Sequence, residues 1–299
     1  LLARLEERRD PVKLNAHCFW MMWQYLAGGR FEDSVAMCDR GIELADLIGT
    51  QPVQYGGIKA IALSEMGRYD LVAGAIGQEV TDGDHPFGQA MASLARSCYL
   101  TRISAWRPAA ESLLDTMQRA TDLSRVWMQA WAASLMTTVA AHLDHELGDD
   151  VAALRDATTG FGDGGRTLAG AEAALVAGRA DDALAMLRPI ADRSGTTRDG
   201  TSALELLARA QLAAGEAEAA LATADEGLAA AVETGFGSLE WRFQAVRFLS
   251  LDELGRGDRA GDARRAALSG LDMLAARIDE PELRAWFTGQ PLARSLTPG

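Results

Sequence analysis

Residues 25–35 read YLAGGRFEDSV, and this stretch decides the fold. An apolar segment is followed by two glycines, a charged residue and a second segment in which the small residue Ser34 stands five positions after Gly29. Glycine tolerates the backbone conformation that ends a helix, and acids such as Glu32 stabilise the positive N-terminus of the next helix. The stretch therefore predicts two antiparallel helices joined by a tight turn.

The same order of residues recurs along the chain. Similar segments occupy 61–72, 174–184 and 211–221. Starting from Gly29, we place the turns at Gly67, Ala105, Gly148, Gly178, Gly215 and Gly255. The intervals between these turns are 38, 38, 43, 30, 37 and 40 residues. Periods of this size are typical of stacked helical hairpins, so the sequence predicts an all-α, right-handed superhelix of about seven hairpins.

Each predicted hairpin has an A helix before its turn and a B helix after it. The expected A helices are 12–27, 52–66, 86–103, 123–144, 166–177, 200–213 and 238–254. The expected B helices are 31–48, 70–80, 107–121, 149–159, 181–192, 216–233 and 258–277. Small residues five positions after each turn, such as Ala110 and Ala220, let the two helices approach closely.

The chain divides into four predicted parts. Residues 1–11 form the end of a preceding helix, 12–160 and 161–277 form two groups of repeats, and 278–299 form a capping helix and tail. Residues 158–166 contain four glycines, so we expect a flexible linker between the two groups. The abrupt start within a helix suggests that the chain is part of a longer protein.

Composition and charge restrict the classes of function. About half of the residues are apolar (48%) and only 6% are aromatic, which favours closely packed helices. The net charge of −13 argues against binding of nucleic acid or an anionic membrane by this segment. Three cysteines without metal-site spacing, and no export signal or long apolar run, indicate a cytoplasmic protein without disulfides.

The repeats resemble a tetratricopeptide-repeat array over residues 12–277. In that family an aromatic residue commonly stands two positions after the turn glycine, as Phe31 and Tyr69 do. Its small residue seven positions before the glycine is matched by Ala60, Ala171 and Ala208. Ala180 and Ala217 depart from the aromatic position, so the copies are degenerate. The resemblance implies a scaffold for protein–protein interaction.

The acidic, alanine- and arginine-rich repeats are also similar to the C-terminal repeat regions of large actinobacterial regulators. The similarity includes the ending RAWF at 284–287, PLAR at 291–294 and LTP at 296–298. In those regulators an ATPase module precedes the repeats, accompanied by a cyclase-like or LuxR-type domain. The resemblance implies a bacterial signalling or transcription regulator, with a protein, a peptide or an adjacent ATPase domain as the partner.

No catalytic, cofactor or metal motif stands out in the sequence. There is no GxxxxGK[ST] phosphate loop, and the glycine-rich residues 161–165 lack the lysine of such a loop. His142 and His145 lie on one helix face beside acids, but no third metal ligand is evident, so a structural or solvated helix end is expected. Cys18 and Cys38 are expected to be small buried residues. We therefore expect a protein that is not an enzyme and has no cofactor.

An aromatic stripe is the candidate binding feature. Trp20 and Trp23 share one A helix, and Trp127 and Trp131 share another. The A helices line the concave side of such solenoids, so these rings could hold a peptide, an amphipathic helix or a small molecule. Arg96, Arg102 and Arg107 could add anion-binding capacity in the same groove. Packing between adjacent repeats is the alternative role for the tryptophans.

We therefore expect a non-catalytic scaffold for protein interaction or ligand sensing. In the alternative hypothesis the chain is a receptor domain that binds a small molecule or peptide in the aromatic groove. In both hypotheses, occupation of the groove would change the curvature of the solenoid or its contacts with a neighbouring module.

Overall fold

A computed structural model describes residues 10–80, 85–144, 163–194 and 196–297 of the chain. Over these residues the secondary structure is helical and contains no strand, which confirms the predicted all-α helical-repeat solenoid. The first helices are α2 (Pro11–Ala27), α3 (Phe31–Ile48), α4 (Tyr55–Glu65), α5 (Tyr69–Val80), α6 (Pro86–Arg102), α7 (Trp106–Asp122) and α8 (Val126–His142). The later helices are α10 (Asp163–Val176), α11 (Ala180–Ser194), α12 (Arg198–Ala213), α13 (Ala217–Thr234), α14 (Gly237–Glu253), α15 (Gly257–Ala275), α16 (Pro281–Thr288) and α17 (Pro291–Arg294).

Consecutive helices pack as hairpins in the predicted order. A and B helices pair as α2 with α3, α4 with α5, α6 with α7, α10 with α11, α12 with α13, and α14 with α15. Five predicted turn glycines lie in the described residues and all have φ between 69° and 78°: Gly29, Gly67, Gly178, Gly215 and Gly255. The B helix expected at 149–159 lies outside the described residues, and α8 packs directly on α10.

Two turns are displaced from their predicted positions. The third turn residue is Ser104, at φ 60°, and Ala105 is already the N-cap of α7. Trp106 therefore takes the aromatic position two residues after the turn, and the fully buried Ala109 takes the small position expected for Ala110. In the next hairpin α8 ends at His142 with Asp144 at φ 55°, before the expected turn at Gly148. A left-handed turn can use serine or aspartate at a modest cost in strain.

The linker expected at 158–166 is partly helical. Helix α10 begins at Asp163, so Gly164 and Gly165 belong to its first turn. The rest of the expected linker lies outside the described residues. Gly165 does not have a positive φ, and a Cβ atom placed on it would meet no heavy atom within 4 Å. Its lack of a side chain therefore leaves open space beside the A helices.

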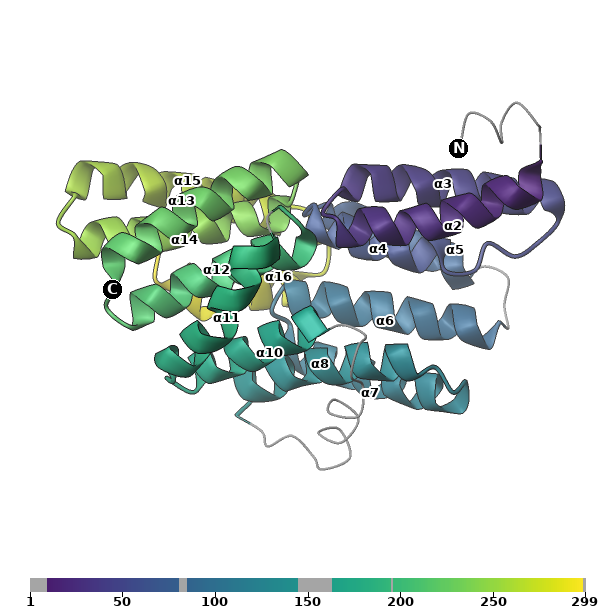
Figure 1. Ribbon diagram of the computed structural model, residues 1–299, viewed down its shortest axis with the longest axis horizontal. Coiled ribbons are helices and arrows are strands. Elements are labelled where there is room, and N and C mark those ends of the chain that lie inside the picture. Colours follow the sequence, from purple (N-terminus) through teal and green to yellow (C-terminus); the bar gives the residue numbers. More distant parts are fainter. Residues whose placement is uncertain (1–9, 81–84, 145–162, 195, 298–299) are drawn as a thin grey trace.

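The two ends of the array pack against each other. The first A helices, α2 and α4, contact the late A helices α12 and α14, and these segments meet in the middle of Figure 1. The Phe31 and Phe236 rings lie 4.9 Å apart between centroids in an edge-to-face arrangement. Arg277 donates a hydrogen bond to the Gly67 carbonyl at 2.9 Å. The concave side of the solenoid is therefore closed by contacts between residues distant in the sequence.

The closed arrangement produces a core that spans both ends. One apolar cluster joins Leu26 and Ile58 of the first two hairpins with Phe236 and Phe243 of the last ones. A second cluster brings Tyr69 and Trp241 against Phe287 of α16, with ring centroids 5.9 Å from Phe287 in both cases. Helix α16 thus covers the junction between the two ends rather than extending the stack.

Candidate functional site

The closed concave side contains a polar cavity of about 150 Å³. The A helices α4, α6, α8, α10, α12 and α14 all contribute to its wall, together with Trp106 of α7. Its charged lining residues are Glu65, Arg102, Glu172, Arg198, Asp199, Glu205 and Arg242. Charged side chains in a protein interior must be paired or hydrogen-bonded, because an isolated buried charge is strongly unfavourable.

Glu65 connects the two ends of the array through an ion triad. Its side chain is only 3% exposed at the end of α4, where Arg102 Nη2 lies 2.5 Å from Oε2. Arg198, at the start of α12, donates from Nε to Oε1 at 2.7 Å, and its Nη2 lies 2.6 Å from the same oxygen. Burial alone would raise the pKa of Glu65, but the two guanidinium groups outweigh it and lower the pKa. The carboxylate is therefore ionised at neutral pH.

Glu205 is the centre of a second network. The side chain is 4% exposed, and Arg242 of α14 donates to its Oε1 at 3.2 Å. Arg209 donates to both Glu205 oxygens at 3.4 Å. Arg242 also donates from Nη2 to Gln290 Oε1 at 2.7 Å, and Ser104 donates to the same oxygen at 3.3 Å. This network ties the residue before α17 to the cavity wall.

Glu172 of α10 is the third carboxylate of the cavity. Its Oε1 lies 3.2 Å from His142 Nε2 and 3.7 Å from Arg209 Nη1. Burial would raise the pKa of Glu172, but the His142 hydrogen bond and the positive charge of Arg209 lower it to about 2. The His142 ring in turn stacks on Trp106, with centroids 3.9 Å apart. His142 therefore orients a cavity carboxylate, while His145 lies outside the described residues.

An aromatic cavity of about 410 Å³ adjoins the polar one. Its wall includes Trp23, Trp127 and Trp131, with Trp23 edge-to-face on Trp127 at 5.6 Å and tilted against Trp131 at 6.2 Å. Arg198 lies over the Trp131 ring, 5.6 Å from its centroid. The structure thus brings three of the four predicted tryptophans into one wall, beside a guanidinium group of the polar cavity.

The other predicted site residues have different locations. Trp20 is 66% exposed and packs edge-to-face on Phe19 rather than lining the aromatic cavity. Arg102 lies in the polar cavity, as described above. Arg96 lines a separate groove between α6 and α7, and Arg107 is exposed at the start of α7. Arg102 and Arg96 thus line different cavities, and the walls of the polar and aromatic cavities include neither Arg96 nor Arg107.

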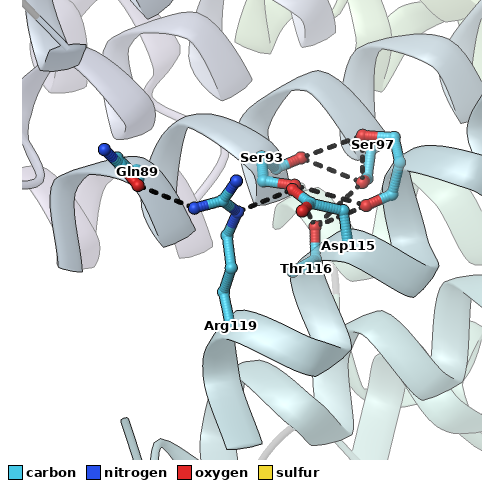
Figure 2. A network of polar contacts seen from close by, with 7 residues as sticks. Gln89, Ser93, Ser97, Asp115, Thr116 and Arg119 are labelled. Atoms are coloured by element: carbon cyan, nitrogen blue, oxygen red, sulfur yellow. Dashed lines mark hydrogen bonds and ion pairs between the residues drawn. The ribbon is translucent and has the colours of Figure 1, made fainter. Parts of the chain in front are cut away.

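The groove between α6 and α7 has a volume of about 480 Å³ and a polar network beneath it. Figure 2 shows Asp115 accepting hydrogen bonds from Ser93 Oγ and Arg119 Nε, both at 2.7 Å. Ser93 and Ser97 also exchange hydrogen bonds with Thr116. Burial would raise the pKa of Asp115, but Arg119 and Ser93 lower it, so this carboxylate is a weak base. Its internal partners fit a seam between helices better than a catalytic centre.

The described residues give three further findings. Within them, no group of three histidine, cysteine or acidic side chains is arranged to hold a metal ion. None of the helices in that part of the chain is both long and apolar enough to cross a bilayer. The three cysteines are buried, and no disulfide bond joins any two of them.

Comparison with known proteins adds no family assignment. The sequence matches no protein-family model, and a comparison with curated proteins finds no significant match.

Proposed function

We propose that this chain is a non-catalytic helical-repeat sensor module that binds a small ligand inside its closed concave side. The observation that carries the proposal is the adjoining pair of cavities, one lined by charged groups and one by tryptophans. Ligand sites are typically concave and largely apolar, with a few convergent polar groups. An open groove for a long peptide is less well supported, because α2 and α4 pack against α12 and α14.

The mechanism follows from which hairpins supply the wall of the polar cavity. Glu65 belongs to the second hairpin and Arg198 to a hairpin 133 residues later, and both line the polar cavity. A ligand that contacts both would stabilise the closed arrangement relative to any more open one, by an amount set by its differential affinity. Binding would thus change the curvature available to the array. In a larger regulator with an ATPase module, as the sequence resemblance implies, that change would gate the neighbouring module.

A thermal-shift screen of small metabolites tests this proposal. Gly165 lines both cavities and has open space where a Cβ would lie, so Gly165→Leu should fill the site without a backbone clash. A compound at a hundred times its Kd stabilises the native state by about 2.7 kcal/mol, which raises Tm by several degrees. We expect at least one compound to stabilise the wild type but not Gly165→Leu. The proposal fails if no compound does so.

A protein-binding surface is a second candidate function. On α2, Val12 is 61% exposed and Trp20 is 66% exposed, and Ala16 between them is also exposed. These residues are four positions apart and therefore form one apolar stripe on the helix. Such a stripe suits a helix or peptide of a protein partner. If this surface binds the partner, Trp20→Glu should abolish capture of the partner while leaving the thermal stability of the free chain within a few degrees.

A further inference from the structure

The two cavities form one binding region with a charged end and an aromatic end. They share five lining residues: Trp131, Ser134, Gly165, Arg198 and Asp199. The charged end is large enough for a small head group, because about 150 Å³ corresponds to roughly five times the volume that a water molecule occupies in the liquid. The aromatic end, at about 410 Å³, has room for a ring or a large aliphatic group.

The charged end presents both signs of charge to a ligand. Within the described residues, Arg242 donates from Nη1 to Glu205 and from Nη2 to Gln290, which leaves further N–H donors of its guanidinium group available. Glu172 uses Oε1 for its contacts with His142 and Arg209, and no described residue donates to its Oε2, which remains an acceptor. In addition, the buried Thr101 hydroxyl, also in the wall, has no hydrogen-bond partner among the described residues. A ligand that is only an anion would be attracted by Arg242 but repelled by Glu172, and a ligand that is only a cation would be attracted by Glu172 but repelled by Arg242.

The aromatic end adds a preference for an apolar group. Trp23 and Trp127 meet at 90°, and the Trp131 ring is tilted against Trp23, so the wall presents both ring faces and ring edges. Rings pack favourably in both the edge-to-face and the offset arrangement. Since Arg198 already lies over Trp131, the ring of a ligand would pack beside a guanidinium group that belongs to the charged end.

We propose that the region binds a small zwitterion with an aromatic or large apolar side group, the chemical class of free aromatic amino acids. The carboxylate of the ligand accepts hydrogen bonds from Arg242, its ammonium group donates to Glu172 Oε2, and its side group packs against Trp127 and Trp131. This inference rests on the proposed small-ligand function and names the class of ligand for the same site.

Three probes with the same ring test the ligand class by isothermal titration calorimetry. L-phenylalanine carries both charges, 3-phenylpropanoate lacks the ammonium group, and 2-phenylethylamine lacks the carboxylate. A site built to hydrogen-bond a polar group discriminates strongly against an analogue without it. We therefore expect L-phenylalanine to bind at least tenfold more tightly than either analogue. Equal or tighter binding of one analogue, or no binding of L-phenylalanine, would overturn the assignment.

Three variants place the binding in this region. Gly165→Leu should abolish binding of L-phenylalanine, whereas the matched control Gly165→Ala should retain it. Glu172→Gln should weaken the binding of L-phenylalanine at least tenfold but change the affinity for 3-phenylpropanoate by no more than about twofold. General unfolding would not produce this difference between the two ligands. Binding that persists in Gly165→Leu would overturn the proposed location.

The outcomes separate this inference from the proposed function. If one analogue binds as tightly as L-phenylalanine and Gly165→Leu removes that binding, the chain is still a small-ligand receptor but the zwitterion class is wrong. If the metabolite screen yields no Gly165-sensitive ligand and the three probes also fail to bind, both proposals are wrong.

Discussion

Replacing Glu65 by glutamine should cost far more stability than a typical charge deletion. The substitution keeps the size and shape of the side chain but removes the negative charge from a site that is 3% exposed. It leaves Arg102 and Arg198 facing a neutral amide, with each guanidinium side chain 21% exposed. The variant therefore tests the ion triad that joins α4 and α6 to α12, and not merely the packing at that position.

The magnitude follows from the geometry of the triad. Two unit charges about 4 Å apart attract by about 4 kcal/mol at an effective dielectric constant of about 20, so two pairs are worth about 8 kcal/mol. Relief of the desolvation cost of the carboxylate offsets several kcal/mol of this attraction. We therefore expect Glu65→Gln to lower the free energy of unfolding by about 3–5 kcal/mol.

Urea unfolding at pH 7, followed by circular dichroism, provides the assay. A loss of this size moves the unfolding midpoint by about 1 M or more. Glu43→Gln is the matched control, because Glu43 pairs with Arg40 on the surface, where it is 66% exposed. The control should change stability by less than about 1 kcal/mol. If Glu65→Gln costs no more than Glu43→Gln, the triad does not hold the array together as argued.

Other predictions concern acid stability and packing. Because the folded state lowers the pKa of Glu172 from its ordinary value of 4.5 to about 2, its stabilisation is complete above pH 4.5 and is lost as the pH falls toward 2. The loss amounts to about 3 kcal/mol. Urea unfolding at pH 7 and pH 2.5 should therefore show that acid lowers the free energy of unfolding less in Glu172→Gln than in the wild type, by a corresponding amount. Gly41→Ala and Gly227→Ala should each destabilise by about 1–3 kcal/mol in thermal unfolding, since the added Cβ would lie 2.2 Å from the rings that face them. Gly74→Ala, in open space, should instead stabilise by about 0.5–1 kcal/mol.

The hairpin repeat was predictable because its signal is local. A glycine with positive φ, a charged residue and a small residue five positions later recur with the period of the hairpin, and Gly29 and Gly215 have the predicted conformation. The predicted position of the third turn, Ala105, is one residue too late. Ser104 instead adopts the left-handed conformation that the pattern assigns to glycine. The aromatic signal at Trp106 could have revealed the correct register.

The binding region was only partly predictable. Trp127 and Trp131 share a helix face by spacing alone, and the structure adds Trp23 from another hairpin. The pattern could not show that Trp20 stays outside, because its place depends on how the first helix meets its neighbours. The sequence analysis missed Glu65, although a carboxylate within the largely apolar stretch 61–66 indicates a buried charge that needs a partner.

The closure of the array could not be inferred from the repeat pattern. Whether α4 meets α14 depends on small rotations that accumulate over all the intervening hairpins, and no local sequence feature reports their sum. The sequence therefore does not indicate that Arg198 and Arg242 line one cavity together with Glu65.

A double-mutant cycle between Phe31 and Phe236 tests most directly whether the two ends of the array pack against each other and enclose the binding region. Their rings are in contact at 4.9 Å although the residues belong to the first and the last hairpins. Phe31→Leu, Phe236→Leu and the double variant should give a coupling free energy of about 0.5–1.5 kcal/mol in urea unfolding. The control pair Phe31 and Phe287, which belong to different core clusters, should be additive. Additive effects of Phe31 and Phe236, within about 0.3 kcal/mol, would contradict the closed arrangement.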